Sequence, residues 1–486
     1  MYHRPSKKAQ VTKLAIIYTI MTSVVLIVVS AMVFYALGYR FNQTDGAIEQ
    51  GSLIQFSSTP RGASVEFDGL RVGGRTPTRD TAIAGNHQVS YQLDGYHEWR
   101  KSFKTNPGDV LWLDYARMIP EQIQTTTVAD YDSLKDMSVS PGRDYIALQE
   151  SGSKPEFSIV DIRKDKVAST TLTLPTKSYT KPTSKTKQSF KIDSWSPDGD
   201  YLLIKHDFGK KHEWILVKRD SAKSAENLTT LLGIDAKSMV MASSNAIYAN
   251  VDGSIRLLNV AKETISRPLV KDVKSYDYRG GFLTYTTLPA KKTNRQTVGY
   301  YDTSSDKSIT IREFKDKTIK TTDIAVGQYY HNQYVAIAVN NDVDIYRGDL
   351  PKSSSRSSLK KIATISLKNG SVEWLNFAPG SQYVYAQHGD SFISYDLATD
   401  TSYSTTLKGQ SKVTQRIQWI DEHTLWSDRD NMLRFYDFDG ANQQDIVSVA
   451  RNYDMAISSN NKFAYSVVES KSGDMVLQRS KLIIDN

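Results

Sequence analysis

A stretch of twelve residues, DSWSPDGDYLLI from Asp193 to Ile204, constrains the fold of this chain more than any other. Pro197 fixes its own φ and Gly199 can adopt a positive φ, so Ser-Pro-Asp-Gly is a turn between two runs rich in apolar residues. The stretch therefore predicts a strand, a tight turn and a second strand.

Degenerate copies of this unit recur through most of the chain at intervals of about 38 to 55 residues. Each copy offers two strands around a turn, a hairpin to a third strand and, in most copies, a fourth strand. The eight copies begin near Met137, Ile192, Met239, Tyr276, Ile324, Val372, Ile417 and Met455.

Four-stranded units with this period are typical of β-propeller blades. We expect an all-β propeller of eight blades over residues 121–486, with seven as the alternative because four copies lack the turn motif. The segment from Gln122 to Val128 is expected to close the ring by adding a strand to the C-terminal blade.

The repeats resemble those of TolB-like propellers, in which Ser-Pro-Asp-Gly precedes an aromatic residue and an apolar run. Ser196 to Gly199 matches this pattern fully. Partial matches lie at Ser140-Pro141-Gly142, Ala378-Pro379-Gly380 and Ser458-Ser459-Asn460. The resemblance implies a rigid propeller and specifies no reaction.

Residues 14–38 form an uncharged apolar run, long enough to span a bilayer as a helix of about 20 residues. The tail of residues 1–13 has no acids and carries Arg4, Lys7, Lys8 and Lys13. The positive-inside rule places this tail in the cytoplasm and everything after the linker of residues 39–50 outside it. A cleaved signal peptide is the rival, with Ala36-Leu37-Gly38 as its site, but the run exceeds the usual apolar region of about 7–15 residues.

Residues 51–120 predict a small β-sandwich of about six strands. Leu53 to Phe56 is one strand, and Asp68-Gly69 between alternating apolar residues indicates a hairpin. Residues 74–77 are predicted to form another turn. His87 lies beside a turn glycine with no second histidine at ligand spacing, so a structural role is expected.

This region resembles the PEGA domain, whose pattern combines Pro-x-Gly-Ala, Val-x-x-Asp-Gly, Gly-x-Thr-Pro, Gly-x-His and Gly-Tyr. The matching residues are Pro60, Gly62, Ala63, Val65, Asp68, Gly69, Gly74, Thr76, Pro77, Gly85, His87, Gly95 and Tyr96. Arg61 departs from the pattern, which has Glu there. The resemblance implies an extracytoplasmic spacer or binding module without catalysis.

The net charge of +8 is not a nucleic-acid signature, because the N-terminal tail supplies half of it. The absence of cysteine excludes disulfides, thiolate metal sites and cysteine nucleophiles.

Two basic stretches without acids are the candidate contact sites. Such stretches are usually solvated and mobile, and their functional interpretation is attraction to an anionic envelope polymer or lipid headgroup. The first, residues 175–191, carries Lys177, Lys181, Lys185, Lys187 and Lys191; the second, residues 351–361, carries Lys352, Arg356, Lys360 and Lys361.

No catalytic, cofactor-binding or metal-ligating residue is predicted, and no cofactor. His206-Asp207-Phe208-Gly209 contains the kinase tripeptide, but the chain lacks the other kinase motifs, and this stretch is expected in a hairpin loop. Asp437 to Gly440 lacks the spacing of a calcium loop. A site that assembles from several blades in the central funnel leaves no trace in linear sequence; three or more converging charged side chains would favour catalysis there.

The sequence therefore predicts a monomeric, single-pass protein of the bacterial cell membrane. We expect it to contact the lipid bilayer through its helix and a protein or envelope polymer through its propeller, acting as a binding or scaffold protein. A propeller hydrolase or lyase with a site in the funnel is the alternative.

Overall fold

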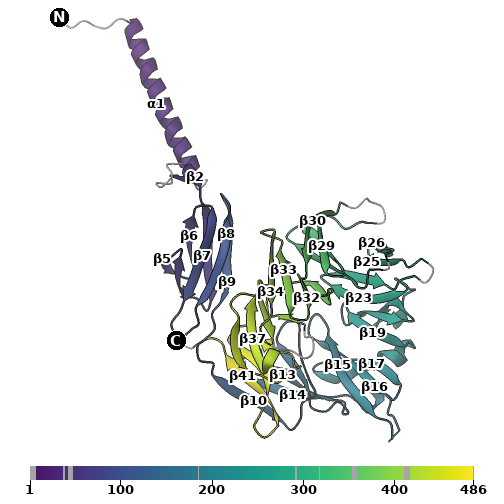
Figure 1. Ribbon diagram of the computed structural model, residues 1–486. Coiled ribbons are helices and arrows are strands. Elements are labelled where there is room, and N and C mark those ends of the chain that lie inside the picture. Colours follow the sequence, from purple (N-terminus) through teal and green to yellow (C-terminus); the bar gives the residue numbers. More distant parts are fainter. Residues whose placement is uncertain are drawn as a thin grey trace, which may run out of the picture. The chain divides into compact units, whose positions relative to one another are not determined.

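The computed structural model describes residues 7–36, 39–41, 48–183, 185–290, 293–316, 318–352, 358–409 and 416–484. The chain divides into two compact units, Met1–Glu121 and Gln122–Asn486 (Figure 1). Each unit has its own hydrophobic core.

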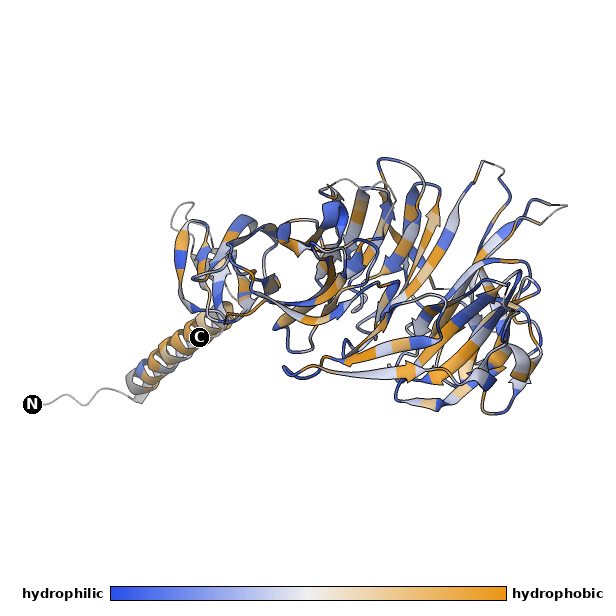
Figure 2. Ribbon diagram, turned by 90° about the horizontal axis from the view of Figure 1, so that it is seen from below, coloured by the Kyte–Doolittle hydropathy of each residue, from blue (hydrophilic) through white to orange (hydrophobic). Residues whose placement is uncertain are grey.

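Helix α1 (Lys7–Ala36) begins before the predicted Leu14, because the preceding Lys, Ala and Gln residues favour helix. Its stretch Val11–Phe34 is long and apolar enough to cross a membrane, and hydrophobic residues run along it in Figure 2. A membrane anchor and a signal sequence both fit this length and composition. A short antiparallel pair, β1 (Tyr39–Phe41) with β2 (Ile48–Gln50), follows.

The rest of the first unit is a two-sheet sandwich. One sheet has the order β6-β3-β9 and the other β5-β4-β7-β8. The strands are β3 (Ser52–Thr59), β4 (Ser64–Phe67), β5 (Leu70–Arg75), β6 (Thr78–Ala82), β7 (Gly85–Gln92), β8 (Trp99–Thr105) and β9 (Val110–Arg117). There are seven strands rather than about six, because the segment around the predicted turn at residues 74–77 forms β5 and β6.

Thr76, which is 4 % exposed, joins two turns of the sandwich through hydrogen bonds. Its Oγ1 lies 2.6 Å from Ser58 Oγ and accepts the N–H groups of Gly62 at 3.1 Å and Ala63 at 3.0 Å. A second set of hydrogen bonds joins the Asp68 turn to β7. Asp68 Oδ1 accepts the N–H of Gln88, and Asp68 Oδ2 lies 2.6 Å from His87 Nδ1. His87 is therefore structural, as expected.

The second unit is an eight-bladed β-propeller, which confirms the predicted fold class and blade number. In its described part, eight four-stranded antiparallel sheets follow one another along the chain. The predicted starting residues all lie in or beside the first strand of a blade. Contacts between neighbouring blades include first strand against first strand, as in β11 with β15 and β27 with β31, and the first strands line the central channel of a propeller.

Blade 1 consists of β11 (Asp136–Val139), β12 (Tyr145–Gln149), β13 (Glu156–Asp161) and β14 (Ala168–Thr173). Blade 2 consists of β15 (Gln188–Trp195), β16 (Tyr201–Phe208), β17 (Lys211–Lys218) and β18 (Ser221–Asn227). Blade 3 consists of β19 (Ala236–Met241), β20 (Ala246–Val251), β21 (Ser254–Asn259) and β22 (Thr264–Ile265), and blade 4 of β23 (Val273–Arg279), β24 (Phe282–Thr287), β25 (Gln296–Asp302) and β26 (Lys307–Phe314).

Blade 5 consists of β27 (Thr322–Tyr329), β28 (Asn332–Val339), β29 (Asp342–Arg347) and β30 (Lys360–Ser366), and blade 6 of β31 (Trp374–Phe377), β32 (Tyr383–His388), β33 (Ser391–Asp396) and β34 (Thr401–Thr406). Blade 7 consists of β35 (Gln418–Trp419), β36 (Thr424–Ser427), β37 (Met432–Asp437) and β38 (Gln444–Ser448). Blade 8 consists of β39 (Ala456–Ile457), β40 (Phe463–Glu469) and β41 (Met475–Lys481) and is completed by β10 (Thr125–Tyr131). The short helices η1 (Thr176–Ser178), α2 (Leu228–Leu232) and η2 (Arg429–Asn431) lie between strands.

The ring closes as predicted, because β10 pairs antiparallel with β41 and becomes the outermost strand of blade 8. Hydrophobic clusters join successive blades. At the closure, Met137 and Leu148 of blade 1 pack with Tyr465 and Leu477 of blade 8. Since one four-stranded sheet cannot bury both of its faces alone, this packing between blades is what stabilises each blade.

The hairpin turn between the first and second strands keeps one geometry in four blades despite its varied sequence. In each, the N–H of the fourth turn residue donates to the C=O of the first at 2.8 Å. That fourth residue has a positive φ, which is 73° at Gly199 and 58° to 60° where Arg143, Ser381 or Asn461 replaces glycine. Backbone hydrogen bonding therefore maintains the turn where the motif has decayed.

Candidate functional site in the propeller channel

The first strand of each blade has a free edge toward the channel, so every second N–H on it lacks a strand partner. Asp and Asn side chains satisfy several of these groups. The side-chain oxygens of Asp136, Asp277, Asp323, Asn376 and Asp454 accept the N–H of the next residue at 2.8 to 2.9 Å. The acidic residues that line the channel therefore serve to accept hydrogen bonds from backbone N–H groups at the free strand edges.

Burial shifts the acidity of these carboxyl groups. Desolvation raises the pKa of Asp323 to about 6 against the lowering effect of its bond from Ile324 N–H. Desolvation also raises the pKa of Asp454 to about 6, although that carboxylate accepts N–H groups from Met455 and from Val139 of blade 1. The pKa of Asp136 and that of Asp193 are raised by the same cause.

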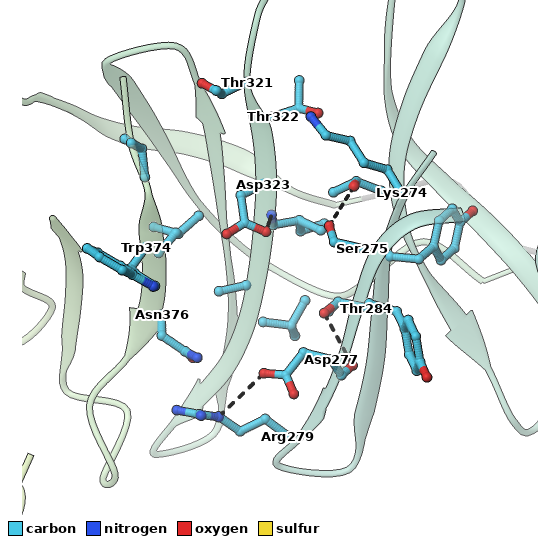
Figure 3. A pocket seen from close by; sticks show the side chains of 18 of the residues that line it. Lys274, Ser275, Asp277, Arg279, Thr284, Thr321, Thr322, Asp323, Trp374 and Asn376 are labelled. Atoms are coloured by element: carbon cyan, nitrogen blue, oxygen red, sulfur yellow. Dashed lines mark hydrogen bonds and ion pairs between the residues drawn. The ribbon is translucent and has the colours of Figure 1, made fainter. Parts of the chain in front are cut away.

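A cavity of about 480 Å³ opens where the first strands of blades 4, 5 and 6 meet. This volume is within the range of about 300–1,000 Å³ typical of small-molecule pockets. Figure 3 shows that β27 lies at the middle of the pocket, with side chains of β23 and of blade 6 on either side. The groups that matter for binding are Lys274, Asp277, Thr322, Asp323, Trp374 and Asn376.

Several polar groups in the pocket make no hydrogen bond to the described residues. Among the described residues, Lys274 Nζ, Trp374 Nε1 and Asn376 Nδ2 have no hydrogen-bond partner, and neither does the buried Oγ1 of Thr322. Arg416, in the loop before blade 7, also lines the cavity and donates to Tyr385 Oη at 2.7 Å. A polar ligand could satisfy these groups together.

The charged groups of the pocket come from different blades but do not form a tight cluster. Asp277 has Arg279 on its own strand at 3.8 Å. No ion pair within 4.0 Å joins Asp323 to Lys274 or Arg416, all of which are described residues. In the same described part of the chain, no group of three or more histidine, aspartate or glutamate side chains is arranged to hold a metal ion.

The lysines predicted in the first basic stretch separate into two sets. Lys177, Lys181, Lys185 and Lys187 are exposed between β14 and β15. Lys191 instead lies on β15, paired in register with Lys205, where its charge lowers the pKa of Asp136 and Asp193 against the effect of burial. It belongs to the channel and not to the loop.

The first stretch is also anchored by hydrogen bonds. Thr180 donates to the Glu213 carboxylate through its N–H at 2.6 Å and its Oγ1 at 2.8 Å. His206 Nδ1 lies 2.8 Å from the same carboxylate, and the His206 ring stacks on Phe190. His206 is in β16, not in a hairpin loop. A buried carboxylate requires such donors, and this requirement holds the connection between β14 and β15 near its middle, at Thr180.

The second basic stretch is likewise only partly a loop. Lys352 is exposed, whereas Lys360 and Lys361 lie on β30, and Lys361 Nζ pairs with Asp344 at 2.6 Å. Arg356 lies outside the described residues.

The two stretches lie at opposite ends of their blades. Strand direction alternates within a blade, so connections from the third to the fourth strand lie at one end and connections to the next blade at the other. The first stretch connects blades 1 and 2, and the second connects β29 to β30. They cannot form one flat contact surface.

Comparisons with known proteins agree with this description. Residues 52–118 match the PEGA domain family. No relative was found among curated protein sequences. The similar solved structures include the propeller domain of Myceliophteria thermophila Cps50 (Swd1), 14 % identical with a TM-score of 0.40, covering 67 % of this chain and 100 % of that one.

Two further solved structures are similar to this chain. The Dos1 propeller is 10 % identical with a TM-score of 0.45 and covers 74 % of this chain and 95 % of that chain. An oligogalacturonate lyase in complex with manganese is 11 % identical with a TM-score of 0.41 and covers 73 % and 99 %. The chain therefore combines a PEGA domain at residues 52–118 with a β-propeller, behind a helix that is a candidate membrane span.

Proposed function

We propose that this protein is a membrane-anchored binding protein of the bacterial cell envelope, whose propeller presents the channel pocket to an extracytoplasmic ligand. The observation that carries the proposal is the set of unpartnered donors on Lys274, Trp374 and Asn376, which meet in one cavity from blades 4 and 6. Helix α1 serves as an uncleaved anchor and the PEGA domain as a spacer. The protein acts as a monomer and needs no cofactor.

The charge distribution supports an orientation with the N-terminus in the cytoplasm. Four basic residues precede the apolar stretch and only Arg40 follows it closely. The PEGA domain and the propeller then lie outside the membrane. No nucleic-acid contact is part of this proposal.

Protease treatment of intact spheroplasts tests the orientation. Digestion from outside should leave only a short membrane-bound fragment, whereas protection of the propeller until the membrane is broken would place it in the cytoplasm and refute the proposal.

A photo-crosslinking residue at Ser275 tests the channel as the binding site in the same cells. Ser275 is exposed and lines the pocket. Ser308 is exposed on β26, the outermost strand of the same blade, and provides the matched control. Products specific to position 275 are expected; equal products at both positions would argue against the channel.

Catalysis in the same pocket is the second candidate function. Asp323 favours it, because a carboxyl group with its pKa raised to about 6 is suited to general acid or base work near neutral pH. A crosslinked polymer that is cleaved by the wild-type protein but only retained by Asp323→Asn would establish the enzyme.

The exposed lysines between β14 and β15 provide a separate contact. We propose that they attract an anionic envelope polymer, with the hydrogen bonds of Thr180 holding the loop between them. Lys352 lies at the other end of the propeller and does not share that contact.

A further inference from the structure

We infer that the channel pocket binds a short, neutral saccharide segment, with Trp374 packing against the face of one sugar ring. This inference rests on the proposed binding function and specifies the ligand class of the same pocket. It follows from what the pocket offers and from what its lining excludes.

The mixture of charges excludes simple ions as ligands. Asp277 and Asp323 oppose an anion, while Lys274, Arg279 and Arg416 oppose a cation. The described lining holds no group suited to a metal ion. A net-neutral ligand avoids both repulsions, since an unpaired charge in a partly buried site is costly.

The ligand must also donate and accept hydrogen bonds at short intervals. The carboxylates of Asp277 and Asp323 have free oxygen lone pairs, whereas the Asn376 amide, the Trp374 indole and the Lys274 ammonium group offer donors. A hydroxyl group both donates and accepts, so a run of adjacent hydroxyls matches this alternating set. The 6 % exposed Thr322, whose Oγ1 is unpartnered among the described residues, would gain a partner after a small rotation.

Trp374 provides the apolar complement of such a ligand. Its side chain is half-buried and lines the cavity, and Figure 3 shows it across the pocket from Ser275. The electron-rich face of an indole attracts polarised C–H groups, which a pyranose ring presents on one side while its hydroxyls project from the rim. A single aromatic surface surrounded by polar groups fits one ring of a saccharide.

A peptide is the strongest rival ligand, because its backbone also alternates donors and acceptors. Peptides commonly bind by adding a strand to a free sheet edge. In this pocket the edge N–H groups of Tyr278, Ile324 and Phe377 already donate to the preceding Asp or Asn side chains. An added strand would have to displace one such side-chain cap at each of the three walls, which favours the saccharide.

The test uses the full chain in detergent micelles and a panel of defined probes. The probes are α-linked and β-linked tetrasaccharides of glucose, a tetrasaccharide of N-acetylglucosamine, a uronate tetrasaccharide and uncharged tetrapeptides. Each probe is titrated into the protein by calorimetry. Binding of at least one neutral saccharide is expected, without binding of the peptides. Binding confined to the peptides or to the uronate, or no binding by any probe, would overturn the inference.

Variants then locate the binding. Trp374→Ala should weaken the neutral saccharide by about tenfold or more. Thr322→Val, which is nearly isosteric and removes only the hydroxyl, should weaken it severalfold. Lys237→Met on β19 changes an exposed lysine outside the pocket and is the matched control.

Unchanged affinity in a folded Trp374→Ala or, if that variant does not fold, in Thr322→Val would place the saccharide elsewhere and refute the site. Failure of the inference is distinguishable from failure of the proposed function, because the protease orientation and the crosslinks at position 275 do not depend on the probes.

Discussion

Replacement of Asp323 by asparagine should stabilise the propeller at neutral pH. The carboxylate is half-buried, and its only hydrogen bond from a described residue is the N–H of Ile324 at 2.8 Å. Asparagine retains that acceptor and removes the charge. Asn376 shows that the geometry is compatible, because its side-chain oxygen accepts the N–H of Phe377 in the same way in blade 6.

The magnitude follows from the pKa of Asp323, which burial raises from 3.8 to about 6. A shift of about two units corresponds to about 3 kcal/mol of penalty on the charged form. Because solvent screens part of this penalty at a half-buried site, we expect a gain of about 1–2 kcal/mol in the free energy of unfolding at pH 8.

The sign is fixed by proton linkage. Between pH 3.8 and about 6 the folded wild-type protein binds more protons at Asp323 than the unfolded chain does. Wild-type stability from this group therefore falls as pH rises through that window and is restored on acidification. The advantage of Asp323→Asn should be full at pH 8 and vanish near pH 4.

Urea unfolding of the full chain in micelles, followed by tryptophan fluorescence at several pH values, measures this advantage. Asp252→Asn is the control, since Asp252 is exposed in a turn with φ of 51°, a conformation that asparagine tolerates well. A variant that is no more stable than the wild type at pH 8, or whose advantage does not change with pH, would refute the reasoning.

Three further outcomes are expected. Thr76→Val should destabilise the PEGA domain by about 1–3 kcal/mol in thermal unfolding, because it leaves the N–H of Ala63 without its acceptor and removes the contact with the Ser58 hydroxyl. The N–H of Gly62 keeps the C=O of Thr76, and Ser58 Oγ keeps the C=O of Pro60. Thr76→Ser should cost about 1 kcal/mol or less. Burial alone would raise the pKa of Glu213, but hydrogen bonds, that of His206 first among them, lower it to about 2. Stability from this group is therefore present above pH 4.5 and lost as pH falls toward 2, so an acid titration of Glu213→Gln should lack this loss. Finally, replacing the four loop lysines by glutamine should weaken pelleting with envelope fragments at low salt and change little at high salt, whereas Lys352→Gln should retain pelleting; equal pelleting by both would contradict the loop as the contact. The four lysines are Lys177, Lys181, Lys185 and Lys187.

The propeller fold was predictable because its signals are local. Pro197 and Gly199 specify a turn by their own backbone preferences, and repetition of the unit specifies the architecture. The decayed turns were less certain from sequence, since Arg143 and Ser381 adopt a positive φ that these residue types seldom take. One of the seven sandwich strands was missed, because Gly74 and Pro77 at the junction of β5 and β6 indicated only a turn.

The pocket was not predictable, because Lys274, Asp323 and Trp374 are distant in sequence and meet only when blades 4, 5 and 6 pack side by side. One signal was present: an Asp or Asn recurs on or just before the first strand of most blades. The basic residues led to a different error, because lysines that lie on strands were predicted to lie in loops. Lys191 and Lys360 belong to strands, since a run of lysines does not reveal which side chains lie at a strand edge.

Strand β10 both closes the ring of blades and is the point at which the chain from the first unit enters the propeller. The chain from the anchor enters the propeller through β10, which is held to β41 by a ladder from Thr125–Ser480 to Tyr131–Met475. In the proposed anchored protein, a force between the membrane and a ligand in the channel would therefore act through the closure of the ring. A single proteolytic cut between β10 and β11 would leave the propeller attached to the first unit by this ladder alone, so release of the propeller would require β10 to separate from β41.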